Sequence, residues 1–194
     1  MKRFVIWALL LWGISPYAQH ISDITKIGRC SEGLISVEKD GKWGFVDTEG
    51  TLVINFRDDI VAKENSPFYS EGLCRISEVR NGIVFYGYMD RTGQTVIPAQ
   101  FLNATPFHNG FAIAIVTSKN IRGKNEYLNM DIVVNEFDEV VINTQGEIVT
   151  YLRELKGILL SGKRYEQPRI ASEMLSNHLV AIKNEDGKWS IHKI

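Results

Sequence analysis

The architecture of this chain follows from residues 40–54, which read Asp40-Gly41-Lys42-Trp43-Gly44-Phe45-Val46-Asp47-Thr48-Glu49-Gly50-Thr51-Leu52-Val53-Ile54. Asp-Gly favours a two-residue hairpin turn, because both of its positions take positive φ. In the second turn, Asp47 can bond its own backbone two residues on, and Gly50 takes the left-handed exit. With the apolar segment Leu34-Ile35-Ser36-Val37 before it, the stretch predicts a three-stranded antiparallel meander.

Parts of this pattern recur along the chain. The first tetrapeptide returns as Asp186-Gly187-Lys188-Trp189, and the second turn returns as Asp90-Arg91-Thr92-Gly93 and Asn143-Thr144-Gln145-Gly146. An entry turn with glycine precedes each apolar segment, and His178 replaces the glycine in the last copy. Two columns, spaced by two residues, place one face of a strand in the core of every copy. They hold Ile35, Cys74, Ala112 and Val180, then Val37, Ile76, Ala114 and Ile182.

Residues 41–54 resemble the signature of WG-repeat (KWG-type) proteins of the exported bacterial type. The second copy keeps an aromatic before its glycine in Tyr86-Gly87-Tyr88-Met89-Asp90, the third lacks Trp-Gly, and the fourth reads Trp189-Ser190. The resemblance implies a scaffold for interactions without a defined ligand. The motif residues are Asp40, Gly41, Lys42, Trp43, Gly44, Asp47, Gly50, Gly87, Asp90, Gly93, Gly146, Gly187 and Trp189.

The predicted fold is all-β. We expect stacked antiparallel three-stranded meanders that form a β-solenoid or superhelical arc, with an incomplete propeller-like arrangement as the alternative. Residues 20–194 make one domain, with units at 30–56, 68–101, 107–149 and 175–194. Two short segments, 151–155 and 171–175, could each form one helical turn.

Residues 1–19 read as a signal peptide. Lys2 and Arg3 precede an uncharged run, residues 4–14, that is too short to span a bilayer, and Ser15-Pro16 ends it. The alternative is an uncleaved membrane anchor. We therefore expect export to the periplasm or the extracellular space, with no stable membrane span after processing. Removing the two cations leaves 20 basic against 23 acidic side chains, a net charge of −3, which disfavours nucleic acid as a partner.

No residue pattern points to catalysis, a metal or a cofactor, so the chain is predicted not to be an enzyme. None of the four histidines has metal-ligand spacing, and His108 falls in a column otherwise filled by turn serines. The acids of Asp58-Asp59 and 136–139 are read as solvated rather than as a catalytic pair. Cys30 and Cys74 stand in columns of packed apolar side chains, although export also allows a disulfide between them.

Two features are candidates for binding. Trp43, Tyr86 and Tyr88 could offer an aromatic ledge to sugar rings, but an aromatic at a repeat column more often packs between units. Residues 117–138 interrupt the period and contain Arg122 and Lys124, so they predict either a binding loop or a tolerated solvent loop with a strand at 132–134. The favoured function is a non-catalytic scaffold that holds a protein partner at the cell envelope. The alternatives are a glycan or cell-wall binding module and, as a minority reading, a hydrolase.

Overall fold

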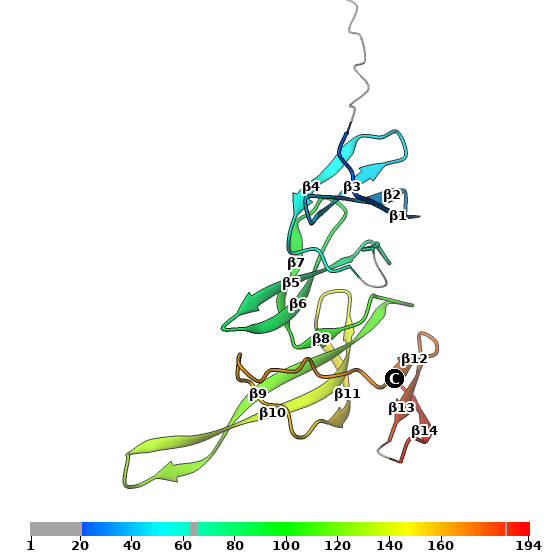
Figure 1. Ribbon diagram of the computed structural model, residues 1–194. Coiled ribbons are helices and arrows are strands. Elements are labelled where there is room, and N and C mark those ends of the chain that lie inside the picture. Colours follow the sequence, from blue (N-terminus) through cyan, green and yellow to red (C-terminus); the bar gives the residue numbers. More distant parts are fainter. Residues whose placement is uncertain (1–20, 63–65, 185) are drawn as a thin grey trace, which may run out of the picture.

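The computed structural model describes residues 21–62, 66–184 and 186–194, so the predicted signal peptide lies outside the described residues. The described residues form strands and turns (Figure 1). No helix among them is long and apolar enough to cross a membrane. The strands are β1 (Lys26–Ser31), β2 (Leu34–Lys39), β3 (Lys42–Asp47), β4 (Leu52–Arg57), β5 (Cys74–Arg80), β6 (Ile83–Met89), β7 (Thr95–Phe101), β8 (Asn103–Ala104), β9 (Phe111–Asn125), β10 (Met130–Asn143), β11 (Ile148–Glu154), β12 (Glu173–Met174), β13 (Leu179–Lys183) and β14 (Trp189–Lys193).

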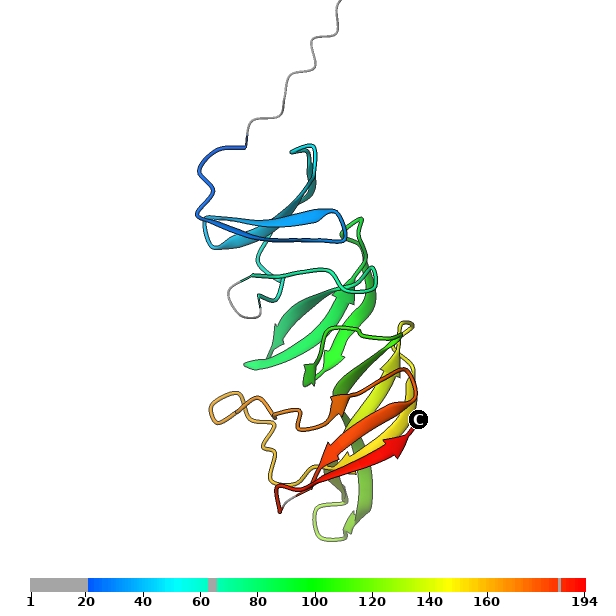
Figure 2. The same cartoon turned by 90° about the vertical axis from the view of Figure 1, so that its right-hand side faces the viewer.

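These strands make four small antiparallel sheets, which confirms the all-β prediction. Their strand orders are β1-β2-β3-β4, β5-β6-β7, β8-β9-β10-β11 and β12-β13-β14. Figure 1 shows the first three sheets following one another along the molecule, and Figure 2 shows the fourth beside the third. Within the described residues the sheets form neither a closed solenoid nor a closed propeller. We call these sheets, with their entry turns, the first to fourth units.

Two-residue turns with positive φ at both positions make the tightest connections. Asp40-Gly41 is one of them, as predicted, with φ values of 52° and 75°. Asn81-Gly82 joins β5 to β6 in the same way, because asparagine and glycine tolerate this backbone region best. The second kind of turn is also confirmed. Asp47 Oδ1 accepts hydrogen bonds from the amides of Glu49 and Thr51, and Gly50 has a φ of 86°.

Aromatic side chains pack between neighbouring units. Phe45 of the first unit meets Tyr69 of the second edge to face, with 4.8 Å between ring centroids. Tyr88 of the second unit meets Phe107 of the third in the same way at 4.7 Å. All four rings are buried, so each unit completes its core against the next one.

Residues 117–138 form the outer part of a hairpin rather than a loop, which corrects the sequence prediction, whereas the predicted strand at 132–134 is part of β10. They extend strands β9 and β10 into one long antiparallel hairpin. Its pairs run from Phe111↔Asn143 to Asn125↔Met130, with one register shift between Ile132 and Val133. The predicted helical turns are also wrong, because residues 151–154 belong to β11 and residues 173–174 to β12. Pairing with a neighbouring strand outweighs the weak local helical preference of these short segments.

The two identical tetrapeptides adopt different turns. Before Trp189, the Asn184 side chain accepts a hydrogen bond from the Lys188 amide, and Gly187 N donates to the Asn184 carbonyl. This is the geometry of the Asp47 turn and not that of the two-residue Asp40-Gly41 turn. Both tryptophans keep the same register with the preceding strand, where Trp43 pairs with Glu38 and Trp189 with Lys183, yet Trp43 is 7% exposed and Trp189 is 51% exposed.

Candidate interaction surfaces

A pair of hydrogen bonds joins each of the first two units to its successor. The Ser31 hydroxyl donates to the Tyr69 carbonyl, and Glu32 Oε2 accepts from the Gly72 amide at 2.9 Å. The same pair recurs one unit later. Ser70 donates to the Phe107 carbonyl at 2.6 Å, and Glu71 Oε2 accepts from the Gly110 amide at 2.8 Å. The sequence signal for this contact is the repeated Ser-Glu-Gly at 31–33 and 70–72, which by itself predicts only an entry turn.

In the described residues, the third unit does not make this pair of hydrogen bonds to a following unit. His108 and Asn109 stand where the first two units have serine and glutamate. His108 N donates to the Phe111 carbonyl at 2.8 Å, which confirms its prediction as a turn residue. The fourth unit instead packs sideways, where Val180 and Ile182 form a cluster with Ile113 of β9. The regular stack therefore ends at the third unit.

The outer half of the β9–β10 hairpin projects from this third unit, as Figure 1 shows. We call residues 118–136 the arm. The inner half is buried through Ile113, Ile115 and residues 140–142 of β10. Beyond it, β8 pairs with β9 only at Ile115 and Ala114, and β11 pairs with β10 only from Asp138 inward. Within the described residues, the arm is thus a two-stranded ribbon with an unpaired edge on each side.

The arm exposes apolar side chains that a solvated loop would not need. Ile121 lies directly opposite Val133, and the two are 62% and 49% exposed. Met130 and Ile132 are also exposed, at 63% and 49%. Exposed apolar side chains that gather on one element, rather than being scattered singly, are typical of interaction sites.

A β-bulge places one of the predicted binding residues. Gly123 pairs with Ile132 and Ile121 pairs with Val133, so Arg122 is the extra residue on β9. Arg122 forms an ion pair of 3.2 Å with Glu136, whose carboxylate also accepts from Asn120 at 3.0 Å. Lys124 is exposed on the same strand. The structure therefore brings Arg122 to the base of the arm and leaves Lys124 further out.

Carboxylates line a hollow of about 250 Å³ at this base. Arg122, Glu136, Asp138 and Glu154 surround it, and Asp138 pairs directly with Glu154 across the strands. Hydrogen bonds from Asn120 and then Arg122 lower the pKa of Glu136. Partial burial, followed by the charges of Glu154 and Glu136, raises the pKa of Asp138.

One of the acids read as solvated is fully buried, which corrects that prediction. Glu139 is 0% exposed, forms an ion pair of 2.7 Å with Arg153, and accepts a hydrogen bond from the Ser172 amide at 2.8 Å. It ties the segment before β12 to the third sheet. No group of three or more histidine, cysteine or acidic side chains among the described residues is placed to hold a metal ion.

The aromatic candidates lie in the core. Trp43, Tyr86 and Tyr88 are 7%, 8% and 0% exposed, and the Tyr86 and Tyr88 hydroxyls are bonded to Gln167 and to the Thr105 carbonyl. These rings pack within and between units, so they offer no open face to a sugar. The geometry therefore does not support the exposed aromatic surface for sugar rings that the sequence suggested.

Cys30 and Cys74 are both free cysteines in the structure. Cys74 is 1% exposed and packs as predicted, and burial raises the pKa of its thiol to about 12. Cys30 is exposed, contrary to prediction. Its counterparts Tyr69 and Phe107 are buried against the preceding unit, whereas Cys30 belongs to the first of the four units.

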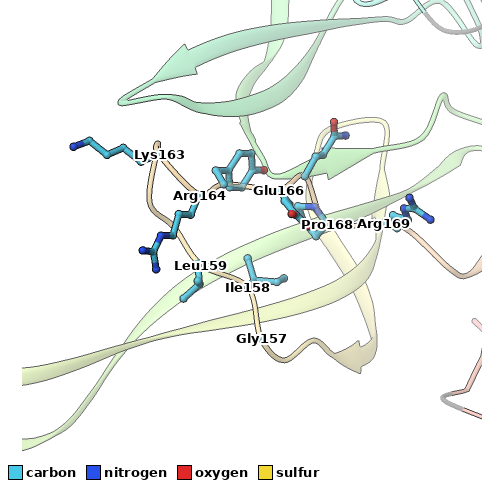
Figure 3. Close-up of a pocket in the computed structure, with 10 residues that line it drawn as sticks. Gly157, Ile158, Leu159, Lys163, Arg164, Glu166, Pro168 and Arg169 are labelled. Atoms are coloured by element: carbon cyan, nitrogen blue, oxygen red, sulfur yellow. The ribbon is translucent and has the colours of Figure 1, made fainter.

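A second hollow, of about 840 Å³, lies along residues 157–169 between β11 and β12 (Figure 3). The segment is held to the body by the Tyr165 hydroxyl, which donates to the Leu102 carbonyl, and by Gln167. Figure 3 shows the side chains of Lys163 and Arg169 on opposite sides of the hollow, with Arg169 turned away from Ile158 and Leu159. The basic side chains thus diverge and form no common site in this hollow. Sequence reasoning did not single out this segment, which has no repeat motif.

Comparison with known proteins identifies the repeat. Residues 24–43, 43–57 and 86–119 match the model of the family described as "WG containing repeat". The first two segments lie in the first unit, and the third runs from β6 of the second unit to β9 of the third. No curated protein and no solved structure matches the chain.

Proposed function

We propose that this chain, which belongs to the WG containing repeat family, is an exported, non-catalytic scaffold that binds a protein partner at the cell envelope through its β9–β10 arm. The observation that carries this proposal is the exposure of Ile121, Met130 and Ile132 on a ribbon outside the core. The stacked units, which we infer to follow a superhelical arc, serve as the rigid base from which the arm projects.

The arm suits a protein partner better than a small ligand. A two-stranded ribbon alone is marginally stable in water, so a partner that covers it gains contacts and also orders it. Its two free edges can accept a further strand, which adds main-chain hydrogen bonds to the contacts of the apolar side chains. Arg122 and Glu136 at its base provide a polar rim, as is usual around an apolar binding surface.

Export is part of the proposal and rests on the sequence of residues 1–19 alone. The apolar run that follows Lys2 and Arg3 has the length of a signal-peptide core and not of a bilayer span. N-terminal sequencing of the protein recovered outside the cytoplasm tests it. An intact Met1 would contradict cleavage.

The arm itself is tested by capture from cell-envelope extract. We expect the immobilised protein to retain one dominant protein, and a variant in which Asn-Gly replaces residues 120–134 between Lys119 and Asn135 to lose it. The shortened hairpin should fold, because its buried part lies at residues 111–116 and 137–142. Equal capture by the shortened variant would refute the role of the arm.

A matched pair of point variants distinguishes specific binding by the arm from nonspecific adsorption to exposed apolar side chains. Ile121→Ser removes an apolar side chain from the arm that is 62% exposed, and Val79→Ser removes one from β5 that is 66% exposed. We expect only Ile121→Ser to weaken capture. Enrichment of polysaccharide without any protein would instead favour the glycan-binding alternative.

A further inference from the structure

One charged side chain is not explained by the repeat. Arg75 stands in β5 directly after the core residue Cys74. The same column holds Ser36, Ile113 and Ala181 in the other units, and these are 0%, 1% and 6% exposed. An uncharged, buried side chain is therefore what the fold requires here. A guanidinium in this column needs a reason of its own.

Arg75 has no acidic partner among the described residues. Its Nη1 donates to the Ala104 carbonyl at 2.9 Å, and none of the ion pairs in the described part of the chain includes it. Burial lowers the pKa of the guanidinium, and the groups that act on it are Tyr88, Tyr86 and Cys74. Those three are uncharged at neutral pH, because the ordinary pKa of tyrosine and of cysteine lies above 7 and burial raises the pKa of each further. The half-buried guanidinium thus has no charged partner among the described residues, which is costly to the extent that water is excluded from it.

A pocket of about 370 Å³ lies beside this guanidinium. Arg75 from β5 and Thr105, which follows β8, line one part of it, and Arg169 and Ser172 from the segment before β12 line another. No carboxylate lines it among the described residues. The pocket therefore joins two positive charges from segments far apart in the sequence. Pro106 and Ile170 supply an apolar part of the lining.

A buried hydroxyl in the same pocket also lacks a partner. Ser172 is 8% exposed, and its Oγ makes no hydrogen bond in the described structure. Its backbone is fixed, because the Ser172 amide donates to Glu139. Thr105 Oγ1 accepts from the Ile113 amide, which leaves its hydroxyl proton free to donate. Buried polar atoms without partners are rare in proteins and call for an explanation such as a bound molecule.

We propose that this pocket binds the oxyanion group, a carboxylate or a phosphate, of a small organic ligand. Arg75 and Arg169 hold the anion, the hydroxyls of Ser172 and Thr105 add donors, and the apolar part of the ligand lies against Pro106 and Ile170. Planar guanidinium groups are well suited to bind both kinds of oxyanion. The volume exceeds the needs of a bare ion, which is why the ligand carries an organic part. The site is independent of the arm.

Calorimetric titration of the purified chain with sodium phosphate, sodium acetate and sodium benzoate tests the proposal, with the ionic strength held constant by sodium chloride. We expect saturable one-site binding of at least one of these anions. Binding of phosphate alone assigns a phosphorylated ligand, and binding of acetate or benzoate alone assigns a carboxylate. Absence of saturable binding for all three overturns the site.

Variants assign the binding to this pocket. Arg169→Gln should weaken the affinity by about tenfold to a hundredfold, the usual effect of losing a hydrogen bond to a charged group. Arg164→Gln, an exposed arginine of the same segment that does not line the pocket, should leave it unchanged. Equal effects of the two variants would overturn the assignment.

A third variant guards against a folding defect. Ser172→Ala removes only a hydroxyl that has no partner, so the melting temperature without ligand should not fall. Its affinity for the bound anion should fall several-fold, as for the loss of one neutral hydrogen bond. An unchanged affinity would overturn the proposed contact between the Ser172 hydroxyl and the anion.

Discussion

Two of the hydrogen bonds that join the second unit to the third can be removed without changing a core residue. Ser70 Oγ donates to the Phe107 carbonyl at 2.6 Å, and Glu71 Oε2 accepts from the Gly110 amide at 2.8 Å. In the double variant Ser70→Ala, Glu71→Ala, we expect each lost bond to cost about 1 kcal/mol. The charge of Glu71 adds little beyond this, because the bond is exposed to solvent.

The free energy of unfolding should therefore fall by about 2 kcal/mol, and the melting temperature by about 4–8 °C for a domain of this size. Urea unfolding followed by far-ultraviolet circular dichroism measures both the midpoint and the slope. A smaller slope would show that the units begin to unfold separately.

The control is Glu49→Ala, which removes an exposed acid from a turn of the first unit. We expect its midpoint to equal that of the unmodified protein. If the double variant also unfolds at that urea concentration, the reasoning is refuted, and other contacts, such as the aromatic packing and the bond from the Tyr88 hydroxyl to the Thr105 carbonyl, hold the two units together.

Three further predictions concern single residues. A hydrogen bond from Thr92 lowers the pKa of Asp90 in the folded protein. Asp90 therefore adds stability above its unfolded pKa, and this stability is lost as the pH falls through the folded pKa. In Asp90→Asn, the melting temperature should depend less steeply on pH in the acid range. The Cys74 thiol should react with a thiol reagent at pH 8 only after denaturation, because burial raises its pKa to about 12; a fast reaction of both thiols in the folded protein would contradict this. Trp43→Ala should cost about 3–5 kcal/mol in chemical denaturation, and Trp189→Ala less than about 1 kcal/mol, because only the first ring is buried.

Local chemistry explains why parts of the fold could be predicted. The Asp40-Gly41 hairpin and the Asp47 turn depend on residues a few positions apart, so their signals are complete within the sequence. Trp189 shows the limit of this reading. Its preceding tetrapeptide is identical to that of Trp43, yet the side chain of Asn184, one step outside the tetrapeptide, selects a different turn.

Long-range contacts explain what could not be predicted. Glu32 and Glu71 adopt φ values of 52° and 55°, a region in which asparagine is the usual residue. Their carboxylates reach the amide of the next unit, which a shorter side chain would not do. Where this bond is absent, in the third unit, the residue is Asn109, with φ 55°. The glutamates thus accept a less favoured backbone for an inter-unit contact that appears only in three dimensions.

The arm was missed for a related reason. Its strands have no core face, so the apolar alternation that reveals a strand is weak between Thr117 and Asn135, and the sequence looked like an insertion between units. Arg75 was missed because the apolar columns that reveal the repeat, at Cys74 and Ile76, lie on either side of it. A charge in a column that is uncharged elsewhere was the available signal.

Both proposed sites lie where the regular stacking of units is interrupted. His108 and Asn109 end the chain of Ser-Glu contacts, so no further unit can stack on the third one in the same way. The fourth sheet therefore packs on the side of β9, and the segment that leads to it passes Arg75 and brings Arg169 and Ser172 there. The hairpin of the third unit, with no successor to cover it, is free to lengthen into the arm. Both proposed sites therefore lie at or beside the irregular third unit.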